Sequence, residues 1–593
     1  MCAVQPMAKS RLGNVFIASC ILFCFYIASM TVIGGVYPFM AAADGVAFAL
    51  FILYFALYVV DYTGKAKINR RLLFVLAVAF ISIVLIEEAF IFGIGLPYLQ
   101  GLMLRGLVMY VLLFAIVVFL ISIGQLARRH SNALFYIMLA SAIAIIVVML
   151  GGRIMIKGII PNDEVFLCYK AFGALLSGKD PYAVSFAAQL MSGFLNGSTL
   201  NPTYTMNNGV VGVAGYPPLY LLSFAPYYLI NHGVRGLSSY MILEITVFSS
   251  ILLLVISWCF DISNHGAMVY GLAVILAFFV FMLLSPMVIL LAAVLLLAYA
   301  KLDRWYGGIL LGSAASIQQL SWMLVVLLIL WSFRESKRAG IRNAAYAILT
   351  FAAISAYFIV LGAHSYIATV FYSVNGNLFP NSMSPIGFMI ARFYGVGASS
   401  FTAVFYITAL LSALVFVYLD VKELAGLFAM LPFAFLGHGQ ASYYLFFMAF
   451  ELVCVYSFKK RSSKKPLPYG NLLPYAMALA VILMLSVIYA SHIGYESNMG
   501  LHAFRYNLSA SGNYITYNAN FEVRGTANAL YVYFTSYSPD NGTLIYLLPN
   551  ATELHVIGGA SSMSVKLPSG NSAYACTIFD ANHSYACPTA RLK

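Results

Sequence analysis

The chain has 593 residues, of which 62% are hydrophobic and only 9% are charged, whereas soluble domains carry roughly 25% charged residues. This composition excludes a water-soluble core of such length and suits helices packed in lipid. The formal net charge of +13 does not indicate a nucleic-acid partner, because the basic residues occur in short runs between apolar stretches. We therefore expect an integral membrane protein whose basic runs mark its topology.

The N-terminal part contains several candidate spanning helices, since a span needs about 20 mostly apolar residues. Lys9 and Arg11, then Lys65 to Arg71, and then Arg128 and Arg129 separate these candidates and fall on one face of the membrane. The positive-inside rule therefore places the N-terminus in the cytosol and residue 152 outside. The candidates are 15–37, 46–60, 72–92, 102–124 and 134–151.

The middle of the chain holds four more apolar stretches between an external Tyr216 and a cytosolic Lys301 and Arg304. These stretches are 217–230, 240–258, 267–284 and 287–300. An odd number of crossings is required, so one of the four is expected to be re-entrant or interfacial. The stretch 217–230 is the shortest, but the pattern does not decide among them.

The next apolar run, Gly307 to Trp331, is interrupted by Gln318-Gln319, which predicts two short helical arms that meet at the outer face. Arg334 to Arg342 and Lys459 to Lys465 are expected to form cytosolic loops, and 363–398 a second external loop that His364 opens. Residues 1–490 are thus predicted to form an all-α polytopic bundle with about 12 to 13 spanning helices, some of them re-entrant. The remaining helices are predicted at 344–362, 399–419, 424–436, 440–458 and 472–490.

The external loop 152–216 is predicted to contain an amphipathic helix. Val165, Cys168, Phe172, Leu175 and Leu176 recur at helical spacing, Gly178 is a plausible C-cap, and Lys179-Asp180-Pro181-Tyr182 indicates a turn. Asn162 or Asp163 would cap the N-terminus of this helix. A cap is the commoner role for an acid at this position, but a capping acid can also face a cavity between helices.

Four features of this region occur in a defined order: Asp163, Tyr169, Gly178-Lys179-Asp180-Pro181-Tyr182, and Tyr216-Pro217-Pro218-Leu219. In this order they resemble the polyprenyl-phosphate-sugar-dependent membrane glycosyltransferases of the C superfamily. The nearest patterns are mannosyltransferase-like families with D…Y…G-x-x-Y…YPPL and the first mannosyltransferase of GPI-anchor assembly. The resemblance extends from residue 70 to residue 457.

The resemblance implies a transferase that moves a mannose-like hexose from a polyprenyl or dolichyl phosphate to an external glycan or lipid acceptor, with inversion. It places the catalytic acid at Asp163, with Glu164 as the alternative; a carboxylate would accept the proton of the acceptor hydroxyl. The substrate-binding candidates are Tyr169, Lys170, Tyr182, Tyr216, Arg392 and His438. Of these, Lys170 and Arg392 could meet the phosphate, as could Arg153 and Lys157. The expected partners are the lipid-phosphate sugar, the acceptor and membrane lipids.

Metal and cofactor signals are weak in this sequence. It has no HExxH, paired CxxC or EF-hand spacing, and it has no P-loop or GxGxxG. Glu87-Glu88 near the outer end of 72–92 are further acidic candidates, because acids within the membrane are often functional. We expect neither a metal nor a nucleotide cofactor.

Residues 491–593 are rich in Asn, Ser, Thr and Tyr and contain short alternating apolar runs, which predicts a small external β domain. Cys576 and Cys587 would form a disulfide there, outside the cytosol. The expected location is the cell membrane of a bacterium or archaeon rather than the endoplasmic reticulum. The main alternative function is a secondary transporter or lipid flippase of the cell envelope; a scaffold without activity is a third reading.

Overall fold

The computed structural model describes a little under half of residues 1–490, together with the strands of the C-terminal part. The described residues are 46–54, 57–58, 61, 69–93, 163–190, 203, 211–225, 228, 287–371, 398–419, 422–436, 443–444, 446–447, 450–451, 473–496, 500–511, 514–537, 544–547, 554–568, 573–579 and 584–586. The helices predicted at 15–37, 102–124, 134–151, 240–258 and 267–284 lie outside these residues. The basic run Lys459 to Lys465 also lies outside them.

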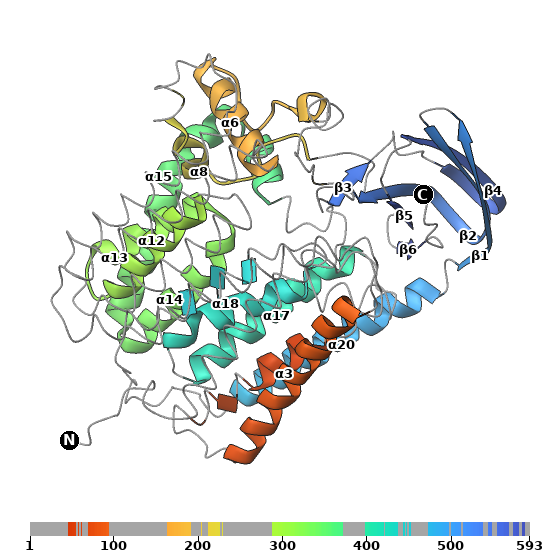
Figure 1. Ribbon diagram of the computed structural model, residues 1–593. Coiled ribbons are helices and arrows are strands. Elements are labelled where there is room, and N and C mark those ends of the chain that lie inside the picture. The colour runs from red at the N-terminus through yellow and green to blue at the C-terminus, as the bar shows by residue number, and fades with distance from the viewer. Residues whose placement is uncertain are drawn as a thin grey trace.

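Most of the described chain is helical, and its long helices coincide with predicted apolar stretches (Figure 1). The predictions of helix at 72–92, 287–300, 399–419, 424–436 and 472–490 are confirmed. The matching elements are α3 (Arg70–Gly93), α12 (Met287–Ala300), α17 (Ala398–Leu419), the short 3-10 turn η3 (Lys422–Leu424) with α18 (Ala425–Ala434), and α20 (Leu473–Glu496).

Two helices in the described part are long and apolar enough to cross a membrane, Lys337–Val370 and Ser400–Leu419. Only 17% and 28% of their most apolar 18-residue windows are buried, whereas the core helix of a soluble protein is mostly buried. Large side chains such as Val360 and Ile348 stand outward, with 86% and 67% of their surface exposed. These faces support membrane association, and the multi-pass topology stays a prediction.

The apolar core lies where α12 and α18 pack around α14 (Leu320–Glu335). Leu291 and Leu295 of α12, Leu324 of α14 and Ala429 of α18 have no exposed surface. Figure 1 shows α14 and α18 in the middle of the helical part, with α12 on one side and α17 on the other. This core provides a rigid base for the loop segments above it.

The predicted break at Gln318-Gln319 is confirmed. Helix α13 (Tyr306–Ile317) ends there because Gln318 is extended, with φ −154° and ψ 140°, and α14 begins at Leu320. Helix α13 also packs closely on α15 (Lys337–Val370) through glycines: a Cβ on Gly308 would stand 2.7 Å from the Asn343 carbonyl oxygen. Small residues allow such close approach between helices in membranes.

The prediction of a loop from Arg334 to Arg342 was wrong, while its cytosolic location stays a prediction. Arg334 lies in the last turn of α14, and α15 already begins at Lys337, so only Ser336 separates the two helices. The hydroxyl oxygen of Ser336 accepts a hydrogen bond from the Ala339 N–H, which is the usual role of an N-cap serine. The basic residues are therefore helical and cluster around a tight turn.

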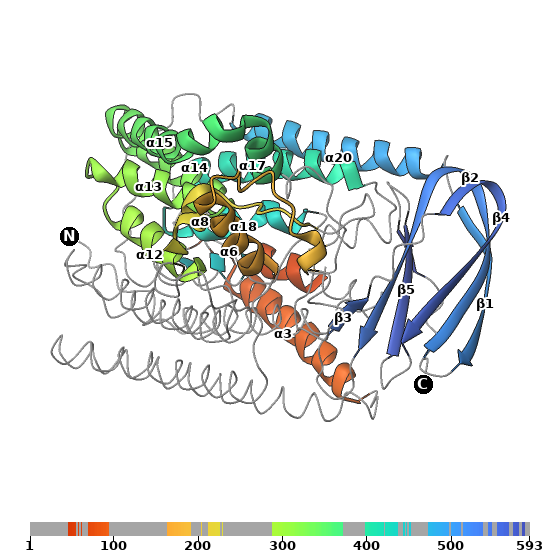
Figure 2. The same cartoon turned by 90° about the horizontal axis from the view of Figure 1, so that it is seen from above.

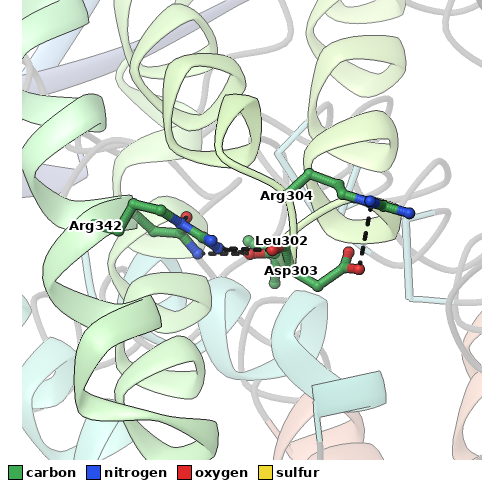
Figure 3. A network of polar contacts seen from close by, with 5 residues as sticks. Leu302, Asp303, Arg304 and Arg342 are labelled. Carbon is green, nitrogen blue, oxygen red and sulfur yellow. Dashed lines mark hydrogen bonds and ion pairs between the residues drawn. The ribbon is translucent and has the colours of Figure 1, made fainter.

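A polar network closes this end of the helical part (Figure 3). The Arg342 guanidinium donates to the carbonyl oxygens of Leu302 and Asp303 at 3.0 and 2.9 Å. The buried Asn343 amide donates to the Leu302 carbonyl and to the Ser332 hydroxyl, both at 2.9 Å. These bonds pair the backbone carbonyls of Leu302 and Asp303 in the turn that follows α12.

Helix α15 also extends further than predicted at its other end. The prediction ended the helix at residue 362 and opened an external loop there, but α15 bends at Gly362, with φ −172° and ψ 82°, and continues to Val370. His364 consequently lies exposed on the helix and does not open a loop. The bend leaves room for another segment of the chain to approach the helix.

The segment predicted to be external forms α6 (Asp163–Leu176) and the five-residue helix α8 (Pro218–Leu222), which Figure 1 draws at the top, beside α15. Helix α8 is too short to span a membrane. It begins the stretch 217–230, and after Ala225 only Tyr228 of that stretch is among the described residues.

The C-terminal strands pair antiparallel around the long strand β2 (Tyr514–Tyr537). Its first part pairs with β1 (Gly500–Ser511) and β4 (Leu554–Pro568), and its last part with β3 (Leu544–Leu547) and β5 (Ala573–Phe579), which pairs with β6 (Ser584–Ala586). Figure 2 draws the strands apart from α12, α13 and α15. Backbone pairing does not establish a separate external domain, which stays a prediction along with the boundary at residue 490. Cys587 lies outside the described residues, so the disulfide also stays a prediction.

Candidate functional site

Helix α6 has the two ends that its sequence predicts. It starts at Asp163, and after it Gly178 adopts a left-handed conformation, with φ 73°. The Lys179 N–H donates to the Ala174 carbonyl and the Gly178 N–H to the Leu175 carbonyl, both at 3.0 Å. This pair of bonds is a Schellman motif, for which glycine is the favoured residue. The helix is thereby fixed in length, and its first turn carries two adjacent acids.

The carboxylate of Asp163 joins α6 to a distant residue. One oxygen accepts the Thr203 N–H at 2.8 Å and the Thr203 hydroxyl at 2.6 Å, and the other accepts the Glu164 N–H at 2.9 Å. Asp163 is 8% exposed. Burial raises the pKa of Asp163 above its ordinary value, although the bonds from Thr203 and Glu164 partly oppose the shift. The residue is thus more than a helix cap, because two of its three donors come from another segment.

Glu164 is buried beside Asp163 and faces α8. Its carboxylate accepts the hydroxyl of Tyr220 at 2.5 Å, and only 4% of the residue is exposed. Tyr220 in turn stacks on Tyr216, with ring centroids 4.7 Å apart. Burial, and then the charge of Glu164, raise the pKa of the Tyr216 phenol well above its ordinary value. Tyr216 therefore stays a neutral hydroxyl group near the two acids.

The turn after α6 fixes the loop onto α15. The Asp180 carboxylate accepts the Tyr182 N–H at 2.9 Å and the hydroxyl of Ser365, next to the Gly362 bend. A Cβ on Gly362 would collide with the same carboxylate. The Tyr182 hydroxyl donates to the Tyr216 carbonyl at 2.9 Å. These contacts join the turn after α6, helix α15 and the segment before α8, and they fix the position of Tyr216.

The break between α13 and α14 supplies another part of the site. The side-chain amide of Gln319 donates to the carbonyls of Gly215 and Val370, so it ties the loop before α8 to the end of α15. Gln318 next to it is 3% exposed, and no described residue pairs with its amide oxygen. Gln319 therefore has a structural role, whereas the amide oxygen of Gln318 has no partner among the described residues.

These segments enclose a cavity of about 290 Å³, close to the lower bound of roughly 300 Å³ for small-molecule pockets. Both acids stand on its wall, and most of the remaining wall is apolar, as in typical ligand pockets. The lining residues are Asp163, Glu164, Leu167, Thr203, Val211, Val213, Gly215, Tyr216, Gln318, Gln319, Leu320, Trp322, Met323, Val326, Thr369, Phe371, Phe405, Tyr406, Ala409, Phe433, Leu436 and Tyr443.

The structure brings together three of the residues that the sequence singled out, Asp163, Glu164 and Tyr216. The other described candidates do not line the cavity. Tyr169 packs on Phe224 and Tyr228, Tyr182 packs on Phe358 and Tyr366, and the Lys170 ammonium stands 5.8 Å from the Phe166 ring centroid. Arg392, His438, Arg153 and Lys157 lie outside the described residues, and no side-chain contact is described for Glu87 and Glu88.

Sequence reasoning missed Thr203, Tyr220, Gln318 and Tyr443 as part of the site. Gln318 had a usable signal, because two adjacent glutamines in an apolar run mark a helix break. Within the described residues, no group of three His, Cys, Asp or Glu side chains could hold a metal ion. The buried Cys168 is a poor nucleophile, since burial and then the neighbouring acids raise its thiol pKa well above the ordinary value.

Comparisons with protein-family models, with curated proteins and with solved structures each find no match to this chain.

Proposed function

We propose that this chain is an integral membrane glycosyltransferase that moves a mannose-like hexose from a polyprenyl or dolichyl phosphate to an external acceptor, with inversion. The observation that carries the proposal is the position of Asp163 and Glu164, both buried and both on the wall of one mostly apolar cavity. Two carboxylates at such a site suit proton abstraction from a hydroxyl group.

Asp163 is the base in this proposal. The acceptor hydroxyl attacks the anomeric carbon and gives its proton to the Asp163 carboxylate, while the bond from that carbon to the phosphate oxygen breaks and its electron pair stays on the phosphate. Thr203 holds the carboxylate in one orientation, which favours a defined attack geometry. The raised pKa of Asp163 makes it a stronger proton acceptor than an ordinary aspartate.

The leaving phosphate needs compensation for its growing charge. Among the described lining residues there is no basic side chain. Leu320, at the N-terminus of α14, lines the cavity, and no side chain caps this helix end. The Ser321 and Trp322 N–H groups already donate to the Gln318 and Gln319 carbonyls, so the helix dipole is what favours an anion here. We therefore assign the phosphate to the side of the cavity where Leu320 begins α14.

The lipid chain would leave the cavity between α14 and α17. Val326 and Tyr406 line the cavity, yet 47% and 52% of their surface is exposed, so the cavity reaches the outer faces of these helices. A polyprenyl chain is too large for about 290 Å³ and would lie along this apolar surface in the bilayer. Only the sugar and phosphate would enter.

The proposed orientation follows the charges. Helix α14 has 16 residues, so its two ends are about 24 Å apart. The acids stand at its first end and the basic residues Arg334, Lys337, Arg338 and Arg342 at its second. By the positive-inside rule, the basic end faces the cytosol and the acids face outside. The polytopic bundle and the external β domain belong to this same proposal.

The decisive experiment is a transfer assay with purified protein in lipid, supplied with radiolabelled polyprenyl phosphate mannose and a membrane extract as acceptor source. Asp163→Asn keeps the shape of the side chain but removes the proton acceptor, so the transfer rate should fall by at least ~10²-fold, as for the loss of a general base. Glu164→Gln should cost less, because Glu164 is engaged by Tyr220.

Asp303→Asn is the matched control, since it makes the same chemical change at the opposite, exposed end. It should keep the wild-type rate, and all variants must elute as the wild type does. A folded Asp163→Asn protein with full transfer would remove Asp163 from the mechanism. A wild type that transfers no sugar, but moves a lipid-linked sugar across sealed vesicles, would favour the flippase.

A further inference from the structure

We propose that Gln318 recognises the transferred sugar, by accepting a hydrogen bond from one of its hydroxyl groups in the cavity. This inference rests on the proposed function and extends it to the choice of sugar. It assigns a specificity-determining contact to a residue at the break between α13 and α14, on the wall of the cavity that the acid pair also lines.

The first observation is the unsatisfied state of Gln318. The residue lines the cavity and is 3% exposed, and among the described residues none lies within hydrogen-bonding distance of its amide oxygen. A buried carbonyl oxygen without a partner is costly and uncommon in folded proteins. A ligand that fills the cavity and donates a hydrogen bond would remove this cost.

The second observation is the chemistry of the groups around the cavity. Three groups on the cavity wall are hydrogen-bond acceptors: the Gln318 amide oxygen and the Asp163 and Glu164 carboxylates. The cavity therefore favours a ligand with several hydrogen-bond donors. A sugar ring offers a hydroxyl on most of its carbons, whereas a carboxylate or an alkyl chain offers none. The anionic phosphate is assigned to the first turn of α14, as proposed above.

Gln319 provides an internal comparison. Its amide is already engaged, since it donates to the Gly215 and Val370 carbonyls. Replacing Gln319 should loosen the loop before α8 and lower activity toward every sugar alike. Replacing Gln318 removes no contact between described residues through its amide oxygen, so its effect should depend on the substrate.

The test measures kcat/KM for wild type, Gln318→Met and Gln319→Met with farnesyl phosphate mannose and each of its monodeoxy analogues. Methionine keeps the length and volume of glutamine without its polar atoms. The wild type should lose at least ~10-fold with one deoxy analogue, because the site is left with an unpaired acceptor. Gln318→Met should lose a similar factor with the parent sugar and nothing more with that analogue.

The contact would be overturned if the loss of kcat/KM caused by Gln318→Met added to the loss caused by the missing hydroxyl for every analogue. It would also be overturned if Gln318→Met kept the wild-type kcat/KM. Gln319→Met should instead lower the thermal midpoint and keep the wild-type order among the analogues. If Gln319→Met alone erased the discrimination, recognition would belong to Gln319 and the proposal would be wrong.

A binding experiment separates this inference from the proposed function. Binding of farnesyl phosphate mannose and of farnesyl phosphate is followed through the fluorescence of the protein, in which Trp322 lines the cavity. The wild type should prefer the mannosylated lipid by at least ~10-fold, and Gln318→Met should lose that preference. If the wild type prefers the mannosylated lipid but transfers no sugar, the role of Gln318 stands and the transferase proposal is rejected. If the wild type transfers sugar but Gln318→Met keeps the same binding preference, only the role of Gln318 is rejected.

Discussion

The two ends of the helical part handle polar groups in different ways. At the acid end, hydrogen bonds join residues far apart in the sequence: Asp163 to Thr203, 40 residues apart, and Asp180 to Ser365, 185 residues apart. At the basic end, Asn343 also bonds a distant residue, Leu302, 41 residues away, but both atoms of its side-chain amide are engaged by protein groups, Leu302, Ser332 and Arg342. None of the cavity-lining residues comes from the basic end.

This difference separates a site from a structural closure. At the basic end, the buried Asn343 side chain is already paired with Leu302, Ser332 and Arg342 and has no bond to offer a ligand. At the acid end, several loops converge, and their polar groups surround a space without filling it. The following predictions test that contrast, from the largest expected effect to the smallest.

The first prediction concerns pH at the acid end. Because burial raises the pKa of Asp163 above 3.8, this base becomes protonated, and inactive, at a higher pH than an ordinary aspartate. The rate of sugar transfer should therefore fall about tenfold per pH unit on the acid side of that raised pKa, and be restored as pH rises. The residual rate of Asp163→Asn should not show this decrease at low pH. An acid limb that persists in the folded variant would assign the titration to another group, with Glu164 as the first candidate.

The second prediction concerns the buried network at the basic end. Asn343→Leu removes three side-chain hydrogen bonds, two donated to Leu302 and Ser332 and one accepted from Arg342, and leaves these groups with fewer partners. The free energy of unfolding should fall by about 1–3 kcal/mol, as measured by denaturant titration in detergent. The folded fraction should keep its wild-type KM, because the residue is remote from the cavity. A changed KM with unchanged stability would contradict the separation of the two ends.

The third prediction tests how Tyr182 supports the site. Tyr182→Phe keeps the ring packing against Phe358 and Tyr366 but removes the bond to the Tyr216 carbonyl. The loss in unfolding free energy should be about 0.5–1.5 kcal/mol. Tyr357→Phe is the matched control, since that tyrosine is 58% exposed, and it should change nothing measurable. Equal effects of the two substitutions would remove Tyr182 as a support of the loop.

The smallest effect is expected for the ion pair between Arg304 and Asp303 (Figure 3). The two charged groups are 3.6 Å apart, but their side chains are 65% and 62% exposed. Exposed pairs contribute roughly 0–1 kcal/mol and are screened by salt. Arg304→Gln should leave the denaturation midpoint within error of the wild type. A large shift would mean that this end is less solvated than its exposure indicates.

Local signals in the sequence predicted much of the acid end. The spacing of apolar residues predicted α6, and Gly178 predicted where it ends. The paired glutamines predicted the break between α13 and α14. These features depend on residues within a few positions of each other, and so they can be recognised without the fold. The turn at Ser336 was missed although Ser336 is a good cap, because the basic run was interpreted as a topology signal and therefore as a loop.

What only the tertiary structure decided is which polar groups meet. The sequence by itself determined the membrane-like composition, the acid pair at a helix start and the position of the helix break. It could not show that Thr203 would hold Asp163 or that Tyr220 would engage Glu164. Nor could it show that the Gln319 side chain is bonded while no described residue bonds the Gln318 amide oxygen. The physical reason is that hydrogen bonds between distant segments depend on how the helices pack, and packing is a property of the whole core and not of any short stretch of chain.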